Sequence, residues 1–326
     1  MRVLVTGATG FTGGHLARSF ARRGYRVRGL ARTAPQAAEL SAAGIEPAVG
    51  VLEDRGALAR AVEQIDVVYH IAAIYRHAGI PEARYRAVNV TAVGDLVDAA
   101  AAAGVTRLVH CSTVGVHGDV ERPPAGEDAP LNPGDVYQRT KLEGERMARA
   151  AAARTGLPVT IARPTGIYGP GDRRLLKLFR GVARRRFVVL GSGDIFYHLT
   201  YIDDLVEGFR LCGEVPAAAN RTYILAGGEV TTLNDLIAII AEEAHVAPPS
   251  LKLPAWPVWL AGAACEAMCV PLGLEPPLYR RRVDFFTKSR AFDITRARVE
   301  LGYAPRVGLR EGISRTLAWY REHQWL

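Results

Sequence analysis

Short runs of β-branched and aliphatic residues alternate with longer polar, helix-compatible segments through the first half of the chain. Such runs are typical of buried strands, and the segments between them are long enough to form helices. This alternation predicts an α/β fold built on a doubly wound parallel (Rossmann) sheet, with ligands bound at the carboxyl ends of the strands. The expected strands are residues 3–5, 26–31, 47–51, 66–71 and 107–111, and the expected helices include 12–23, 55–64 and 137–145.

Three glycines follow the first expected strand, at Gly7, Gly10 and Gly13. Glycine lets the chain turn sharply out of the strand, and it lets backbone N–H groups approach a phosphate at the amino end of a helix. The G-x-x-G-x-x-G spacing indicates a dinucleotide-binding turn, a variant of the commoner G-x-G-x-x-G. A tight turn without a ligand would use the same residues, so the rest of the chain must supply the chemistry.

The end of the second strand bears on the choice between NAD and NADP. In such folds an acidic residue there binds the ribose 2′-hydroxyl of NAD, whereas an arginine suits the 2′-phosphate of NADP. Here Ala31 stands where the acid would be, and Arg32 follows it, with Arg28 behind. NADP is therefore the expected cofactor. NAD is the alternative, in which case Arg32 is only a solvated surface charge.

Tyr137 and Lys141 lie four residues apart on an expected helix, so their side chains share one face. An ammonium near a phenol favours the phenolate, which lowers a tyrosine pKa that is about 10 when unperturbed. A tyrosine tuned in this way can exchange a proton with a substrate oxygen near neutral pH. Because the pair follows the glycine turn and the hydroxyls of Ser112 and Thr113, it indicates an oxidoreductase site.

Composition limits the partners that we expect. The formal charge of +8 is carried almost wholly by arginine, since lysine occurs only at positions 141, 177, 252 and 288. The basic runs 184–186 and 280–282 lack interleaved aromatic residues, so we expect solvated faces and no nucleic-acid partner. The four cysteines form no C-x-x-C pair, which argues against a metal site and a secreted disulfide framework. Since the first residues are already a strand, no signal peptide is expected, and the protein is predicted to be cytoplasmic.

The second half of the chain is expected to form a smaller, interleaved C-terminal substrate lobe. Past residue 170 the chain leaves the sheet, returns for strands near 198–202 and 222–226, and then forms at least three helices. The expected dinucleotide-binding domain is residues 1–168, with return strands around 195–227, and the expected substrate-binding lobe is residues 169–194 and 228–326.

Residues 256–270 are unusually apolar for this chain. Pro257 and Glu266 interrupt the segment, and it is too short to span a bilayer. Two interpretations remain open. The segment is either an ordinary core helix or the roof of an apolar pocket, in which Trp256 and Trp259 would contact the substrate.

Together these stretches resemble the extended short-chain dehydrogenase/reductase family of the NAD-dependent epimerase/dehydratase superfamily. The resemblance covers nearly the whole chain. The matching motifs are Gly7-Ala8-Thr9-Gly10-Phe11-Thr12-Gly13, His70-Ile71-Ala72-Ala73, Ser112-Thr113, Tyr137 to Lys141, Arg163-Pro164-Thr165-Gly166-Ile167-Tyr168-Gly169-Pro170, Tyr201-Ile202-Asp203-Asp204, Phe292-Asp293-Ile294 and Leu301-Gly302-Tyr303.

The resemblance implies a homodimeric enzyme for a small-molecule substrate, with Tyr137 as catalytic acid/base, Lys141 as its partner and Thr113 orienting the substrate. Asn89 would stabilise the sheet and the water chain of the lysine. The cofactor contacts implied are Gly7, Gly10, Phe11, Thr12, Gly13, Arg32, Ala72, Ala73, Asn89, Tyr137, Lys141, Pro164 and Ile167. The substrate contacts expected are Tyr75, Thr113, Tyr168, Tyr197, Trp256 and Trp259.

Departures from the family pattern bear on the substrate. Nucleotide-sugar members usually carry asparagine before the Tyr-Gly-Pro element, where this chain has Gly166-Ile167. They also carry a diphosphate-binding arginine shortly before the Tyr-x-x-Asp stretch, whereas residues 194–198 contain none, although Arg173 or Arg184 could compensate. The 4,6-dehydratases place two acids after the catalytic threonine, where this chain has Val114-Gly115.

Two further stretches resemble branches of the family that act on hydrophobic alcohols or ketones. The apolar segment and residues 279–293 resemble the 3β-hydroxysteroid/sterol dehydrogenases, and residues 30–32 resemble the dihydroflavonol reductases. We therefore expect an NADP-preferring oxidoreductase that interconverts a secondary alcohol and a ketone on a hydrophobic, ring-containing substrate. The alternatives are a nucleotide-sugar 4-epimerase with retained NAD and a catalytically idle protein that senses the cofactor.

Overall fold

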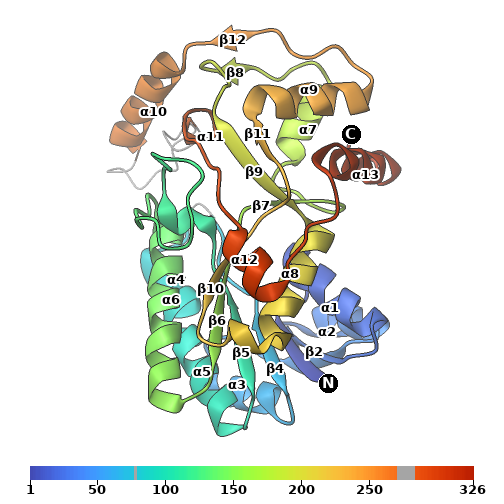
Figure 1. Ribbon diagram of the computed structural model, residues 1–326, viewed down its shortest axis with the longest axis vertical. Helices are drawn as coiled ribbons and strands as arrows, with labels where there is room; N and C mark the ends of the chain where they lie inside the picture. Colours follow the sequence, from blue (N-terminus) through green and yellow to red (C-terminus); the bar gives the residue numbers. More distant parts are fainter. Residues whose placement is uncertain (77–78, 270–282) are drawn as a thin grey trace.

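The computed structural model describes residues 1–76, 79–269 and 283–326. Val270 at the end of the apolar segment lies outside the described residues, as do residues 279–282 with the basic run 280–282. Figure 1 shows a larger part built on a parallel sheet, with a smaller lobe above it. The chain passes between the two parts more than once, as the interleaved pattern predicted.

Seven parallel strands form the central sheet, in the order β10-β6-β5-β4-β1-β2-β3. The direction in which strands are added reverses between β1 and β4, so the carboxyl ends of these two strands flank the crevice where such folds bind ligands. The predicted doubly wound parallel sheet is thus confirmed. The strands are β1 (Arg2–Thr6), β2 (Arg26–Ala31), β3 (Glu46–Val49), β4 (Val67–His70), β5 (Arg107–Cys111), β6 (Val159–Pro164) and β10 (Thr222–Leu225).

Helices cover both faces of this sheet and bury two separate apolar cores. One face is covered by α1 (Phe11–Arg22), α2 (Ala34–Ala42), α8 (Ile202–Glu214) and α12 (Thr295–Leu301). The other face is covered by α3 (Arg55–Val62), α5 (Ala92–Ala102) and α6 (Val136–Thr155). α6 is the longest of them, and it begins at Asp135, whose carboxylate accepts a hydrogen bond from the backbone N–H of Gln138. This cap fixes where the helix starts and therefore where its first turn presents Tyr137.

The smaller lobe holds two short sheets of its own. β7 (Gly166–Tyr168), β9 (Phe196–Tyr201) and β11 (Val230–Thr232) form one sheet, and β8 (Val189–Leu190) pairs with β12 (Lys252–Leu253) in the other. The helices of the lobe are α7 (Leu176–Ala183), α9 (Leu233–Ala244), α10 (Ala255–Cys269), α11 (Asp284–Thr287) and α13 (Leu309–Glu322). Short helical segments of the larger part complete the chain: α4 (Glu82–Arg86), η1 (Ala87–Thr91), η2 (Val114–His117) and η3 (Pro216–Ala218).

One expected return strand does not rejoin the central sheet. The expected strand at 222–226 does so as β10, but the strand expected at 198–202 is β9, which pairs with β7 and β11 in the smaller lobe. An apolar pattern specifies an extended segment and leaves its pairing partner open. Here Gly166 lets β7 approach β9 closely, since a Cβ at that position would lie 2.7 Å from Leu199 Cδ2.

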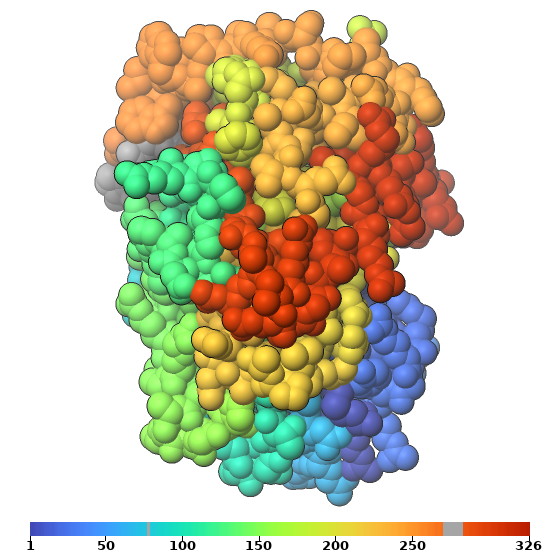
Figure 2. Space-filling view, viewed as in Figure 1, coloured from blue at the N-terminus to red at the C-terminus, as the bar shows by residue number. Residues whose placement is uncertain are grey.

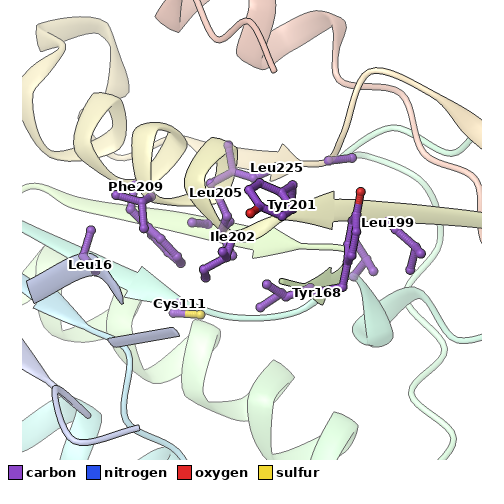
Figure 3. Close-up of a cluster of buried hydrophobic side chains, with 14 of the residues drawn as sticks. Leu16, Cys111, Tyr168, Leu199, Tyr201, Ile202, Leu205, Phe209 and Leu225 are labelled. Atoms are coloured by element: carbon purple, nitrogen blue, oxygen red, sulfur yellow. The ribbon is translucent and has the colours of Figure 1, made fainter. Parts of the chain in front are cut away.

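The two parts share one continuous apolar core. Figure 3 shows Tyr168 and Tyr201 of the smaller lobe in one cluster of buried side chains with Leu205 and Phe209 of α8. All four are at most 3% exposed. Figure 2 shows the C-terminal segment around α12 lying across the boundary between the parts, where Phe292 forms a bridge with Ala125. Because apolar side chains fill the junction, the smaller lobe is held firmly over the sheet.

The apolar helix α10 is not a core helix, so that interpretation of residues 256–270 was wrong. Trp256 is 66% exposed and Leu260 51%, and Gly262 is the buried residue of the helix. The helix lies at an outer corner of the smaller lobe (Figure 1). Of the helices that the structure describes, none combines the length and the apolar character needed to cross a bilayer.

Candidate active site

The glycine turn joins β1 to α1 with its backbone closely packed. Gly7 has a φ of +74°, and its carbonyl oxygen accepts a hydrogen bond from the N–H of Gly10. A Cβ on Gly13 would lie 2.2 Å from the Gly7 oxygen, so only glycine fits there. The amino end of α1 has no side-chain cap and no acidic residue in its first turn. Its N–H groups therefore suit the diphosphate of a dinucleotide, and the residues present fit the expected cofactor.

The structure separates the two arginines near the end of β2. Arg28 is engaged within the protein, because its guanidinium bonds to Glu46 and to the carbonyl oxygens of Arg60, Ala61 and Glu63. Arg32 is exposed, and within the described part of the chain its guanidinium has no hydrogen-bond or ion-pair partner. Of these two arginines, only Arg32 therefore remains free for the predicted contact with the 2′-phosphate of NADP.

Tyr137 lies at the start of α6 and is half-buried. Its ring packs edge-on against Tyr75, with the ring centroids 4.9 Å apart. Burial raises the pKa of Tyr137 well above its ordinary value, and neighbouring Cys111 and Tyr75 add to the rise. Arg76 and Arg174 oppose it. The sequence prediction that Lys141 keeps this pKa low is therefore wrong for the protein alone, because burial outweighs the nearby positive charges.

Lys141 lies one turn further along α6 and is only 1% exposed. Its Nζ is 3.5 Å from His110 Nε2. His110 in turn lies beside His70, with ring centroids 5.3 Å apart, and His70 Nδ1 is 2.8 Å from Thr6 Oγ1. Burial, with Lys141 nearby, lowers the pKa of His70 to about 3 and that of His110 well below its ordinary value. Both imidazoles are therefore neutral, so Lys141 can donate to His110.

Asn89 fastens the loop after β4 to α6. Its side chain accepts from the N–H of Ile74 and donates to the Ile74 carbonyl and to Thr140 Oγ1. Asn89 sits in the π-helical turn η1, and its backbone oxygen would lie 2.3 Å from a Cβ on Gly144. The contact thus places Ala72 and Ala73 over the carboxyl end of the sheet. A Cβ on Gly7 would lie 3.0 Å from the Ala72 nitrogen, so this loop also borders the glycine turn.

The two hydroxyl residues after β5 differ in their surroundings. Thr113 Oγ1 accepts a hydrogen bond from the N–H of Gly115 at 3.0 Å, and the residue is half-buried. Ser112 is 2% exposed, and its Oγ has no hydrogen-bond partner among the described residues. A buried hydroxyl without a partner is unusual, and it marks the carboxyl end of β5 as a place where a ligand group is expected.

Other expected site residues are committed to contacts within the protein. The hydroxyl of Tyr168 donates to the Leu309 carbonyl and that of Tyr197 to the Phe285 carbonyl. Both side chains are buried, as is Ile167, and Pro164 ends β6. Trp256 and Trp259 stand on the exposed helix α10. The assignment of Pro164 and Ile167 as cofactor contacts, and of the two tyrosines and two tryptophans as substrate contacts, stays a prediction.

Two residues beside the Tyr137–Lys141 pair were not identified from the sequence. The Arg76 guanidinium lies 5.7 Å from the ring centroids of both Tyr75 and Tyr137. His110 contacts Lys141 from β5. Both had a signal in the sequence, since each lies at or just beyond the carboxyl end of a sheet strand. That position is shared by many structural residues, however, and only the fold shows which side chains meet.

Comparison with known proteins agrees with this geometry. Residues 3–226 match the family described as "NAD dependent epimerase/dehydratase family". A 2-alkyl-3-oxoalkanoate reductase from Stenotrophomonas maltophilia is 30% identical over 98% of this chain and 99% of its own. A 3β-hydroxysteroid-dehydrogenase/decarboxylase from Arabidopsis thaliana is 30% identical over 82% of this chain, which spans only 50% of that protein.

A solved structure shares the fold over almost the full length. The UDP-glucuronic acid 4-epimerase of Bacillus cereus, in complex with NAD, has a TM-score of 0.79 at 23% identity and covers 99% of both chains. At this identity the likeness shows the fold alone. With the glycine turn, the Rossmann sheet and a family match over most of its length, the chain belongs to the NAD-dependent epimerase/dehydratase family of extended short-chain dehydrogenases/reductases.

Proposed function

We propose that the protein is an NADP(H)-preferring oxidoreductase that interconverts a secondary alcohol and a ketone on a hydrophobic, ring-containing substrate. The observation that carries the proposal is the Tyr137–Lys141 pair on α6. Lys141 is buried against His110, while Tyr137 lies one turn earlier on α6 with its ring against Tyr75. A phenol in this position suits proton exchange with a substrate oxygen.

When bound, the nicotinamide would give or take the hydride at its C4. During reduction, the Tyr137 hydroxyl would donate its proton to the carbonyl oxygen as that carbon becomes a carbinol, and oxidation would return the proton. Burial keeps the phenol protonated, which is the form that reduction consumes. Thr113 would orient the substrate oxygen, and the Lys141 ammonium would stabilise the phenolate left by proton transfer.

The preference for a hydrophobic substrate has two supports. First, two relatives are a 3β-hydroxysteroid-dehydrogenase/decarboxylase and a 2-alkyl-3-oxoalkanoate reductase, both at 30% identity. Second, residues 194–198 carry no arginine for a diphosphate. Of the two arginines that could compensate, Arg173 lies over the Trp325 ring at 5.0 Å, whereas Arg184 is exposed and remains available. The NADP preference is supported by the free guanidinium of Arg32.

Two measurements on the purified protein test the proposal. The nucleotide released on denaturation identifies any retained cofactor, and assays with NADPH and NADH measure reduction of steroid and aryl ketones. We expect an empty cofactor site and NADPH-dependent reduction. Retained NAD with turnover of a UDP- or dTDP-sugar would instead establish a 4-epimerase, and bound NADPH without any turnover would indicate a cofactor sensor.

A further inference from the structure

Arg76 occupies an unusual position for a positive charge next to an apolar substrate site. Its guanidinium carbon lies 5.7 Å from the centres of both the Tyr75 and Tyr137 rings, which themselves meet edge to face. The Arg76 side chain is 35% exposed. The cation is therefore both adjacent to the candidate acid/base and accessible from solvent.

The hydrogen-bonding capacity of Arg76 is only partly used. Its Nε donates to Asp135 Oδ2 at 2.6 Å, and its Nη1 lies 3.5 Å from the Tyr75 hydroxyl. Its Nη2 has no hydrogen-bond partner within the described residues. Asp135 holds the base of the guanidinium and also caps α6 through its other oxygen, which accepts from Gln138 N–H. The guanidinium is thus oriented by one carboxylate, while its outer N–H groups, on Nη1 and Nη2, remain available.

We propose that Arg76 binds a carboxylate on the substrate, so that the preferred substrate is a hydroxy or oxo acid with a hydrophobic body. This inference rests on the proposed function, because it takes Tyr137 as the group that meets the substrate oxygen. A purely apolar ligand would cover the outer N–H groups without replacing their hydrogen bonds to water, which is unfavourable. A carboxylate would pair with the fork in two parallel hydrogen bonds and offset that loss.

The test is a binding titration with stable hydroxy acids. 3-Hydroxy-3-phenylpropanoate and 3-hydroxydecanoate, each beside its methyl ester, are titrated by calorimetry into the full chain saturated with reduced cofactor, which cannot oxidise them. Acid and ester share the hydrophobic body and differ in the charge. We expect each acid to bind at least about tenfold more tightly than its ester, because a hydrogen bond to a charged group contributes about ten- to a hundredfold in affinity. We also expect the preference to decrease as salt is added.

Variants separate carboxylate binding from a structural role. Arg76→Met should lower the affinity for the acids about ten- to a hundredfold and for the esters much less. Arg76→Lys should retain part of the preference, since it keeps the charge and loses the fork. Arg139→Met is the matched control, because Arg139 is an exposed arginine on α6 that pairs with Glu82. It should leave the acid-to-ester ratio unchanged.

Asp135→Asn provides an independent check. Asparagine caps a helix as well as aspartate does, so α6 should be preserved while the carboxylate that competes for Arg76 is removed. The acid preference should then persist or increase. Equal affinity for acid and ester, or an equal loss of both in Arg76→Met, would overturn the inference. Turnover decides the proposed function separately: cofactor reduction with none of the four compounds would count against alcohol oxidation, while the binding data would still decide the role of Arg76.

Discussion

The candidate site has a buried half and a solvent-facing half, and α6 contributes one residue to each, Lys141 and Tyr137. In the buried half, Lys141 and the two histidines beside it are at most 1% exposed, and they contact one another. In the solvent-facing half, Tyr137 is half-buried, Tyr75 is 45% exposed and Arg76 has unused hydrogen-bond donors. The side chains of the buried half are thus held by packing within the fold. Those of the solvent-facing half remain accessible to a ligand.

The largest expected effect tests the outer half. Tyr137→Phe should lower kcat roughly 10²–10⁴-fold, because a positioned acid/base contributes about that much, while binding of the cofactor is retained. Stopped-flow or steady-state assays with saturating NADPH measure kcat. Tyr25→Phe is the control, since the Tyr25 hydroxyl contacts Glu214 far from the site and its loss should leave kcat unchanged. A Tyr137→Phe enzyme with more than about a tenth of the wild-type kcat would remove Tyr137 from its role.

The buried half predicts a loss of stability in acid. The pKa of His70 is about 3 in the folded protein, against about 6.5 when unfolded. Between these values the unfolded chain binds a proton that the folded protein does not. The contribution of His70 to the free energy of unfolding should therefore be fully present above pH 6.5 and decrease as the pH drops toward 3. The share from His70 is up to about 5 kcal/mol by pH 3, of which about 3 kcal/mol is lost by pH 4.5.

Urea unfolding between pH 7.5 and 4.5 measures this dependence. His70→Asn can still accept from Thr6, and it should flatten the decline even if it lowers stability at neutral pH. His110 should continue to contribute its own share, because its pKa is also lowered by burial. The control is His323→Asn at an exposed position. Identical slopes for wild type and His70→Asn would show that His70 takes up no additional proton on unfolding.

A smaller effect is expected at the solvent-facing end of the cofactor site. Arg32→Ala should weaken NADPH binding by roughly 1.5–3 kcal/mol, about ten- to a hundredfold, with little change for NADH. The reason is that only NADPH carries the 2′-phosphate. Fluorescence titration of both nucleotides measures the difference. Arg26→Ala, at the other end of β2 and also exposed, is the control. An equal loss for both nucleotides would exclude the 2′-phosphate as the partner of Arg32.

The smallest effect on stability is expected on the exposed helix α10. Trp256→Ala should change the free energy of unfolding by less than about 1 kcal/mol, because Trp256 is 66% exposed. Phe209→Ala in the shared core, at 0% exposed, should cost about 3–5 kcal/mol. If Trp256 also lines the substrate pocket, a steroid ligand should bind about 1–3 kcal/mol more weakly to the variant. Unchanged ligand affinity would remove Trp256 from the predicted substrate contacts.

The elements predicted correctly from the sequence are those with a local signal. Buried strands, the glycine turn and the helix that carries Tyr137 and Lys141 each depend on residues close together in the chain. Gly13 illustrates why this works: the residue that would clash with its Cβ lies only six positions away, at Gly7. The family resemblance depended on the same local motifs, and the family match confirmed it.

The sequence by itself determined the alternation of strands and helices along the chain, the glycine turn and the spacing of Tyr137 and Lys141. Periodicity and turn geometry act over a few residues, so these features have a local signal. The tertiary structure alone decided that β9 pairs outside the central sheet and that α10 stays exposed. It also decided that burial raises the pKa of Tyr137 and that Arg76 lies beside it. Strand pairing, burial and charge proximity depend on residues far apart in the chain, and these are fixed only when the segments pack together.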